Sequence, residues 1–348
     1  MIAASRPIQR PPDAKLLVID RFCRITHNRR SDFMQLLRRG DLIVANDAAT
    51  MPASLQGKHL LTNQRIEVRL AGRHSLSAED VLEFSAVVFG DGDFHVATED
   101  RPAPPGIAAG DRLALGPLSA TVKRLLDHPR LLHLQFDGTP DEVWAGIARH
   151  GHPIQYSYVQ EPLEMWDVWS PIAGPPVAFE PPSAGFALDW KSLAEMRTRG
   201  VRFATITHSA GISSTGDACL DRRLPLDEPY RIPESTAAAI ALTKVSGGRV
   251  VAIGTTVVRA LEHAAEPGGR IRSGEGVATQ RLGLGSLLFV VDAILSGTHE
   301  PGTSHYDLLR AFTDDATLQR AGLELEARGY RTHEFGDSVL IERAESNV

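Results

Sequence analysis

Hydrophobic positions along the chain change their spacing twice, near residue 57 and again near residue 150. Before the first change, residues 31–47 carry apolar positions at helical spacing and then a continuous apolar run. Ser31 is the predicted helix N-cap, and Gly40, after Arg38 and Arg39, is the predicted C-terminal stop. This segment therefore predicts a helix followed by a strand, as in an α/β fold.

Between about 57 and 136 the helical spacing nearly disappears, and short apolar runs alternate with turn residues. The runs are RIEVRL, SAVVFG, DFHVAT, DRLALG, SATVKRLL and LLHLQF. Many short strands separated by turns are typical of a small antiparallel barrel or sandwich.

Helical spacing returns after DGTP (137–140), where Thr139 is a predicted N-cap and Pro140 occupies the first helical position. Further helices are predicted at 189–200, 233–248 and 303–312, separated by apolar strands such as VRFATITH and RVVAIG. The predicted fold is an α/β/α sandwich with an inserted antiparallel β-barrel. We expect the barrel at 57–148 and the discontinuous α/β/α domain at 1–56 and 149–348.

Composition narrows the class of protein. A chain of 348 residues with 43% hydrophobic and 23% charged residues predicts an ordinary globular protein of about two domains. It has no run of about 18 apolar residues and no apolar stretch behind the N-terminal charges. Cys23 and Cys219 lie far apart without a CxxC motif, so we expect neither a zinc cluster nor a disulfide framework, and a cytoplasmic location. The net charge of −6 argues against a surface coated for nucleic acid.

The most informative short motif is RVVAIGTTVVRALE (249–262), a buried strand that leads through a tight turn into a helix. Gly254 permits the turn, while Thr255 and Thr256 bring hydroxyl and N–H groups to a helix N-terminus, which favours a carboxylate or phosphate. Arg259 and Glu262 share one helix face, so the alternative is a plain helix with an i,i+3 ion pair. The turn is neither GxGxxG nor a P-loop, which argues against nucleotide phosphate.

Two further polar loops follow predicted strands. His208 ends VRFATITH, and His299 lies in SGTHEPGTSH (296–305). Ligands of open α/β sheets bind beyond the carboxyl ends of strands, so a shared pocket is predicted, although a loop-capping histidine and plain turn chemistry are the alternatives. GxSxG, HExxH and paired Cys/His motifs are absent from the sequence. His27, His59 and His152 lack motif context and are expected at the surface.

Several blocks occur in the order seen in S-adenosylmethionine:tRNA ribosyltransferase-isomerases, and the chain resembles that family from about residue 15 to 342. The blocks are GDLIVANDAATMPASLQG, RIEVRL, FDGTP, SAGF, GGRVVAIGTTVVRALE, VVDAILSGTHEPGTS and YRTHEFGDSVLIE. The resemblance implies an α/β/α domain with an inserted β-barrel. It also implies transfer and isomerisation of the ribosyl part of S-adenosylmethionine onto 7-aminomethyl-7-deazaguanine in tRNA, which gives epoxyqueuosine and releases adenine and methionine.

This chemistry needs a proton acceptor near C5′, donors for the methionine carboxylate and a site closed to water. It implies S-adenosylmethionine as co-substrate, tRNA as partner, no metal, no membrane, and a monomeric enzyme. Residues carried over from the matching motifs are His208, Glu228 and His299 as catalytic candidates, and Gly254, Thr255, Thr256, Arg259, Asn46, Asp47 and Asp337 as substrate-binding candidates.

The chain also departs from the family pattern. Ala49 stands where the family has an arginine, Ala187 and Leu226 stand where it has histidines, and the SGTHEPGTS block lacks the family's asparagine and, at Gly302, its lysine. Two alternatives therefore stay open: a divergent S-adenosylmethionine-using enzyme with a non-tRNA acceptor, and a non-catalytic ligand-binding relative. A basic stripe of Arg29, Arg30, Arg38 and Arg39 is the predicted compensation if tRNA is the acceptor.

Overall fold

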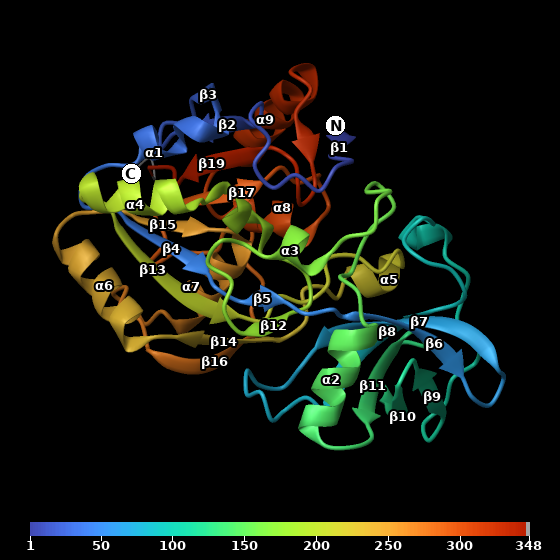
Figure 1. Ribbon diagram of the computed structural model, residues 1–348. Coiled ribbons are helices and arrows are strands. Elements are labelled where there is room, and N and C mark those ends of the chain that lie inside the picture. Colours follow the sequence, from blue (N-terminus) through green and yellow to red (C-terminus); the bar gives the residue numbers. More distant parts are fainter. Residues whose placement is uncertain (346–348) are drawn as a thin grey trace.

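A nine-stranded sheet forms the larger part of the computed structural model, which describes residues 1–345 (Figure 1). The strand order is β16-β14-β13-β4-β15-β17-β19-β2-β3, and the central neighbours β13, β4, β15 and β17 are parallel. The strands are β2 (Lys15–Ile19), β3 (Ile25–Arg29), β4 (Leu42–Asn46), β13 (Arg202–His208), β14 (Glu228–Ile232), β15 (Val250–Ile253), β16 (Gly274–Ala278), β17 (Ala293–Gly297) and β19 (Ser338–Glu342).

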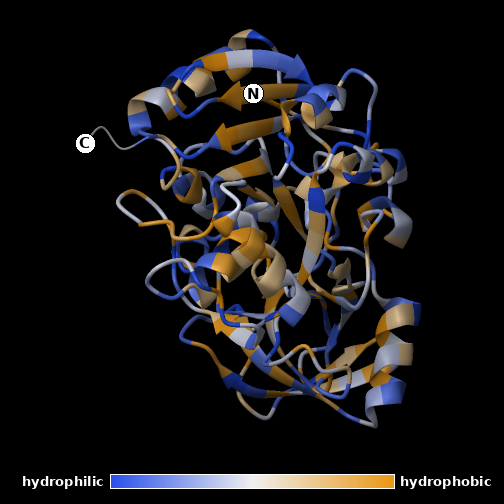
Figure 2. Ribbon diagram, turned by 90° about the vertical axis from the view of Figure 1, so that its left-hand side faces the viewer, coloured by the Kyte–Doolittle hydropathy of each residue, from blue (hydrophilic) through white to orange (hydrophobic). Residues whose placement is uncertain are grey.

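Helices cover both faces of this sheet because its central strands are apolar on both sides. Leu42 and Val44 of β4 pack in one core with α6, α7, α8 and α9, while Ile43 and Ala45 pack in another core with α1 and α4. The strands carry the strong hydrophobic colour in Figure 2. These helices are α1 (Phe33–Leu36), α4 (Trp190–Thr198), α6 (Glu234–Val245), α7 (Thr255–Ala264), α8 (Ser304–Leu309) and α9 (Asp315–Ala327).

A closed antiparallel barrel interrupts the larger domain between β5 and α2, in the order β10-β11-β8-β7-β6-β9. Its strands are β6 (Ser54–His59), β7 (Gln64–Gly72), β8 (Glu83–Phe89), β9 (Arg112–Leu115), β10 (Leu118–Leu125) and β11 (Leu131–Phe136). The predicted α/β/α fold with an inserted barrel is confirmed. The boundary at 56/57 stays a prediction, and β6 crosses it.

Helix α2 (Pro140–His150) packs on the barrel and begins as the sequence predicts. The Thr139 side chain accepts a hydrogen bond from the Glu142 N–H, and the Glu142 carboxylate accepts one from the Thr139 N–H. This capping box satisfies two N–H groups that the helix geometry leaves without partners.

Two further two-stranded sheets lie outside the main sheet and the barrel. Strand β1 (Ile2–Ala3) pairs with β18 (Arg331–Thr332), and β5 (Ala49–Thr50) pairs with β12 (Pro176–Ala178). The remaining helices are α3 (Met165–Val168) and α5 (Ala218–Asp221), with 3-10 turns at Arg30–Asp32, Thr98–Asp100 and Ser183–Ala187. In the part of the chain that is described, every helix is too short or too polar to cross a membrane.

Three local predictions are wrong. Ser31 does not cap a helix; it lies inside a 3-10 turn, and Asp32 instead accepts a hydrogen bond from the Arg29 N–H. The DFHVAT run forms turns rather than a strand. His59 is fully buried rather than exposed, because its Nε2 lies 3.1 Å from the Asp111 carboxylate inside the barrel.

Candidate active site

Four parallel strands bring most of the predicted site residues to one edge of the sheet. Strand β4 ends at Asn46, β13 at His208, β15 just before Gly254, and β17 at Gly297, two residues before His299. These strands are direct neighbours in the sheet, so their carboxyl ends lie side by side. Strand β14 is antiparallel to β13 and therefore starts at this same edge. The order of the strands therefore brings the three predicted loops together at one edge.

His208 and Glu228 lie together at the centre of this edge. His208 is fully buried, and its Nε2 is 3.2 Å from Oε2 of Glu228, whose side chain is 8% exposed. Within residues 1–345 neither ring nitrogen of His208 has a partner in hydrogen-bond geometry. A buried imidazole without a well-formed hydrogen bond is costly in a folded protein, so this ring is suited to a bound ligand.

Glu228 is held from two other sides. Its Oε1 accepts a hydrogen bond from the Gly211 N–H at 2.6 Å, and its Oε2 accepts one from Nη1 of Arg259. Burial alone would raise the pKa of this carboxyl, but His208, Arg259 and the Gly211 N–H outweigh burial and lower the pKa to about 2. Glu228 is therefore a fixed negative charge at neutral pH.

Arg259 lies on α7 and is occupied by the protein itself. Besides Glu228, it donates from Nε to the Gln280 carbonyl at 3.0 Å and from Nη2 to the carbonyls of Leu226 and Ala278 at 2.9 and 2.8 Å. The sequence assigned Arg259 to the substrate, which stays a prediction, and in the structure Arg259 holds Glu228. The alternative ion pair of Arg259 with Glu262 does not form in the described residues 1–345.

Glu262 instead caps a turn of backbone. Its carboxylate accepts hydrogen bonds from the N–H groups of Phe289, Val290 and Val291 at 2.7 to 3.0 Å. The same helix thus uses one side chain to fix Glu228 and another to fix the segment that enters β17.

Asn46 fixes the backbone of His208. Its amide donates to the His208 carbonyl at 2.9 Å, and its oxygen accepts from the His208 N–H at 2.9 Å. Asp47 is half-buried and accepts a hydrogen bond from the Thr207 hydroxyl at 2.7 Å. Asn46 therefore positions the imidazole, while Asp47 keeps one carboxylate oxygen outside this bond.

Gly254, Thr255 and Thr256 form the turn from β15 into α7. Gly254 has φ of 96°, a left-handed conformation that favours glycine, and α7 has no side-chain cap. Thr255 is buried and Thr256 is half-buried. The first N–H groups of a helix lack intrahelical partners, so this end of α7 is suited to an anion.

His299 stacks on His305, with ring centroids 4.8 Å apart. Its Nε2 lies 2.9 Å from the Ser296 hydroxyl, and burial together with the neighbouring His305 and His333 lowers its pKa well below the usual value. Burial also lowers the pKa of His305, an effect that the Glu228 charge opposes. Both imidazoles are therefore neutral at physiological pH.

A second group near this edge was missed by the sequence analysis. Tyr156 stacks on Tyr158 and Tyr158 on His333, with centroids 5.9 and 4.1 Å apart. The Tyr156 hydroxyl donates to the buried Glu180, whose pKa is raised by burial, against the effect of that hydrogen bond, to about 7. The Tyr-x-Tyr spacing in QYSYVQ was the only sequence signal for this stack.

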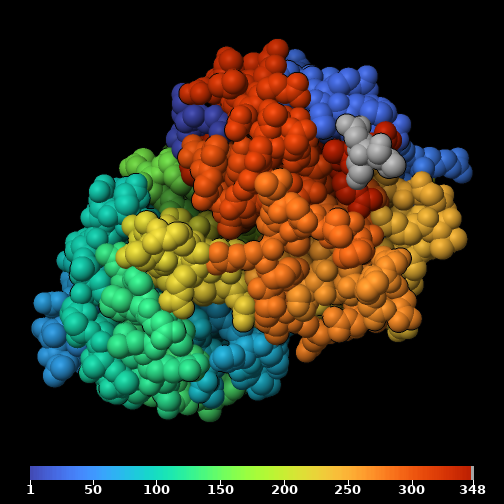
Figure 3. Space-filling model, turned by 180° about the vertical axis from the view of Figure 1, so that it is seen from behind, coloured from blue at the N-terminus to red at the C-terminus, as the bar shows by residue number. Residues whose placement is uncertain are grey.

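The Ser209–Asp217 loop joins the two groups. The Tyr156 hydroxyl also donates to the Ser214 carbonyl at 3.2 Å, and the loop begins directly after His208. Downstream, Leu220 and Leu224 pack in the barrel core, and Figure 3 shows this segment in yellow between the barrel and the C-terminal part. The candidate site thus lies beside the barrel.

Asp337 is held by backbone N–H groups. Its two carboxylate oxygens accept hydrogen bonds from the N–H groups of Lys15 at 2.7 Å and Arg331 at 2.8 Å, and the side chain is buried. It ties the start of β2 to β18, and these contacts favour a structural role over the predicted substrate contact.

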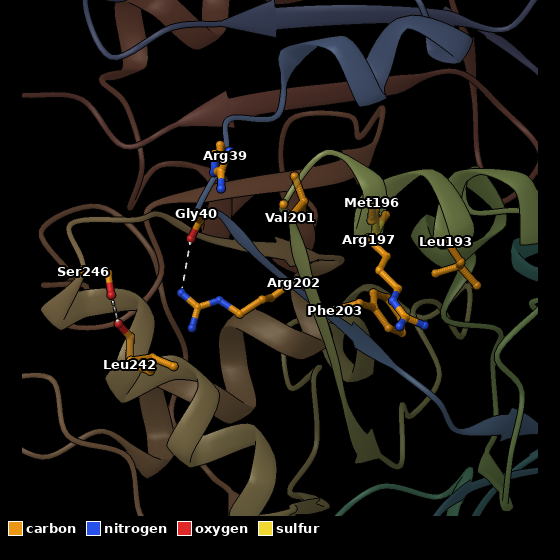
Figure 4. A pocket seen from close by; sticks show the side chains of 11 residues that line it. Arg39, Gly40, Leu193, Met196, Arg197, Val201, Arg202, Phe203, Leu242 and Ser246 are labelled. Carbon is orange, nitrogen blue, oxygen red and sulfur yellow. Dashed lines mark hydrogen bonds between the residues drawn. The ribbon is translucent and has the colours of Figure 1, made fainter.

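An open hollow lies at the opposite edge of the sheet (Figure 4). It has a volume of about 690 Å³ and is lined at the start of β13 by Arg202 and Phe203, and by Arg39, Leu193 and Leu242 nearby. Because β13 runs from Arg202 to His208, its length separates this hollow from the candidate site. The candidate site is therefore identified by its buried polar side chains and not by the volume of a hollow.

Comparison with known proteins shows to which family the chain belongs. A family model described as queuosine biosynthesis protein matches residues 1–341. The chain belongs to this family. The S-adenosylmethionine:tRNA ribosyltransferase-isomerase of Gloeobacter violaceus is 31% identical over 97% of this chain and 92% of its own length. The protein of that name from Pelobacter propionicus is 31% identical over 98% of this chain and 96% of its own length.

A solved structure supports the fold of this queuosine biosynthesis family member. The crystal structure of S-adenosylmethionine tRNA ribosyltransferase from Thermotoga maritima matches with a TM-score of 0.51 and 22% identity, over 98% of this chain and 96% of the other. The predicted membership of the family is confirmed.

Three of the four residues at which this family member departs from the expected motifs pack against other parts of the protein, and the fourth is exposed. Ala49 is 4% exposed in β5, and Ala187 packs beneath the sheet with α1 and α4. Leu226 packs against the barrel core while its carbonyl accepts from Arg259. Gly302 is exposed, with φ of 89° and open space around it.

Proposed function

We propose that this chain transfers and isomerises the ribosyl moiety of S-adenosylmethionine onto 7-aminomethyl-7-deazaguanine in tRNA, releasing adenine and methionine. Membership of the queuosine biosynthesis family and near full-length similarity to S-adenosylmethionine:tRNA ribosyltransferase-isomerases support this reaction. The observation that carries the assignment to this site is the fully buried His208, whose Nε2 lies 3.2 Å from the charged Glu228 and whose Nδ1 has no hydrogen-bond partner within residues 1–345.

His208 is proposed as the group that accepts the C5′ proton. A neighbouring sulfonium acidifies this proton, and an imidazole within hydrogen-bond reach can take it. The positive charge that then forms on the ring lies 3.2 Å from the Glu228 carboxylate, which stabilises it. Asn46 fixes the backbone of His208, and Arg259 fixes Glu228, so both act as positioning residues.

The turn at Gly254, Thr255 and Thr256 is proposed to bind the methionine carboxylate. The helix N-terminus offers N–H groups and a partial positive charge, and the Thr256 side chain is accessible there. In this arrangement the carboxylate sits on α7, whose second turn carries Arg259 toward Glu228. One helix therefore couples substrate binding to the position of the charged pair.

His299 is proposed to act on the acceptor side, together with Asp47. The neutral imidazole of His299 can take a proton from the attacking amine, because an unprotonated ring nitrogen is the form that accepts one. Asp47 has a carboxylate oxygen available for a substrate hydroxyl. Both residues follow the carboxyl ends of central strands.

This chain lacks several of the cationic residues that the family pattern predicts for binding the tRNA acceptor. The proposed basic stripe does not form a continuous surface: Arg30 is 8% exposed and donates to the carbonyls of Gly336 and Gln9, and Arg38 pairs with Glu342. With Ala49 and Gly302 in place of cations, these observations favour as second candidate a free deazaguanine-type acceptor.

One experiment separates these possibilities. The full-length protein is incubated with S-adenosylmethionine and either tRNA carrying 7-aminomethyl-7-deazaguanine or the free base, and adenine, methionine and product mass are measured. The main proposal predicts adenine release and a modified tRNA nucleoside. Modification of the free base alone supports the second candidate. If no adenine is released with either acceptor, the chain is a non-catalytic relative.

The residue assignment has its own test. His208→Gln is expected to lower the rate of adenine release by roughly 100- to 10,000-fold, the usual contribution of a general base. His152→Gln is the matched control, because His152 is an exposed histidine that forms hydrogen bonds to residues 1–345 through its backbone and not its side chain. Circular dichroism and calorimetric S-adenosylmethionine binding check that the His208 variant is folded. Unchanged turnover in that variant would remove His208 from the mechanism. A cytoplasmic location and a monomeric state stay predictions.

A further inference from the structure

Two histidines and a glutamate converge on the barrel domain. Ligand atoms of His74, Glu83 and His133 all lie within 4.8 Å of one another. Nε2 of His133 is 3.1 Å from Oε2 of Glu83, and the rings of His74 and His133 have centroids 5.6 Å apart. Nothing in the proposed reaction uses these three side chains.

Strand register explains why they meet. Strands β8 and β11 pair Ser85 with His133, so Glu83 lies one step along the same face, because alternate residues of a strand share a face. Strand β7 pairs Gly72 with Ser85, so the chain that continues from Gly72 carries His74 toward Glu83. Strands β8 and β11 thus supply one ligand each, and the loop that follows β7 supplies the third.

We propose that His74, Glu83 and His133 bind one Zn²⁺ ion. Two imidazoles and one carboxylate are a ligand set that zinc accepts, with water as the fourth ligand. Zinc bonds of 2.0–2.2 Å in tetrahedral geometry place ligand atoms roughly 3.3 Å apart. The His133–Glu83 separation of 3.1 Å already matches this spacing, and His74 is exposed and free to close the remaining distance.

The ion would pin the loop between β7 and β8. This loop is already shaped by Arg73, which donates to the Ser77 and Asp80 carbonyls, and by Trp144, which donates to the Ala78 carbonyl at 2.9 Å. The same loop carries Leu76 across to a small core of the larger domain formed by Ala48, Val177, Ala178 and Ala210. Zinc at His74 therefore fixes the contact between the barrel and the α/β/α domain.

The test uses full-length protein without a purification tag, first stripped of metal by a chelator. Zinc affinity is measured by competition with a chromogenic chelator, and we expect one ion per chain. His74→Ala, Glu83→Gln and His133→Ala are each expected to weaken binding by at least roughly 10- to 100-fold, because the loss of an outer-shell partner of a metal ligand already costs that much. His74 is exposed, so His74→Ala tests the site even if a change at the more buried His133 impairs folding.

His95→Ala is the matched control. His95 is also a barrel histidine beside a carboxylate, with Nδ1 2.8 Å from Asp93, but within residues 1–345 no third ligand residue joins that pair. The proposal expects full zinc affinity in this variant, and a zinc-dependent rise in melting temperature in wild type that His74→Ala loses. Wild type that binds zinc no more tightly than His74→Ala, or an equal loss in His95→Ala, would overturn the site.

Discussion

Glu228 offers the most quantitative prediction, because its charge is buried and its partners are known. Its folded pKa of about 2 lies below the ordinary 4.5, so the folded state stabilises the ionised form. The shift of about 2.5 units at about 1.4 kcal/mol each corresponds to roughly 3 kcal/mol of stability. This agrees with the roughly 3–5 kcal/mol lost when one member of a buried ion pair is removed.

The perturbation is Glu228→Gln, which keeps an oxygen for the Gly211 N–H but removes the charge beside Arg259. Because the folded pKa is depressed, the stabilisation is complete above the unfolded value of 4.5 and is lost as the pH falls toward 2. We therefore expect the variant to be less stable than wild type by roughly 3 kcal/mol at pH 7, and by only about 1 kcal/mol at pH 3.

The assay is urea unfolding followed by tryptophan fluorescence at pH 7, 5, 4 and 3 for both proteins. Glu326→Gln is the control, because Glu326 is an exposed glutamate outside every ion pair formed by residues 1–345, and its effect should stay within about 0.5 kcal/mol. A stability gap for Glu228→Gln that stays constant from pH 7 to pH 3 would refute the reasoning that the buried charge causes it.

Three further changes test other contacts. Asp337→Ala leaves two half-buried N–H donors without an acceptor, so urea unfolding should show a loss of up to roughly 1–3 kcal/mol for each; adenine release per folded molecule should stay the same, and a selective loss of turnover would place Asp337 in the site. Glu180 has a pKa raised to about 7, so wild-type stability should fall as the pH rises from 4.5 through 7, by up to about 3 kcal/mol, and Glu180→Gln should flatten this profile in the same assay. Thr139→Ala removes the cap of α2 and should cost about 1 kcal/mol in chemical denaturation, with no change in adenine release.

The sequence predicted the parts of the fold that depend on local pattern. Alternating apolar residues identified most barrel strands, and the Thr139-Pro140 pair located the start of α2. The shared edge of His208, Gly254 and His299 followed from the rule that parallel strands present their carboxyl ends together. These features depend on spacing within a few residues or on sheet topology alone.

The contacts that define the site are long-range, which is why spacing could not reveal them. Arg259 has Glu262 three residues away on its own helix, yet it pairs with Glu228 across the sheet edge. Tyr156 finds its acceptor Glu180 beyond an intervening helix, and Arg30 is buried against backbone carbonyls although its charge suggested a surface stripe. Such pairings are set by tertiary packing and not by the sequence near either partner.

The place of β19 in the sheet determines the order in which the chain can complete its fold. This strand lies between β17 and β2, so the β2–β3 hairpin reaches the rest of the sheet only through Ser338–Glu342. All six barrel strands, by contrast, fall within 54–136 and can pair as soon as that segment is available. During synthesis the barrel can therefore form early, while the first strands of the larger domain wait for the last one to emerge.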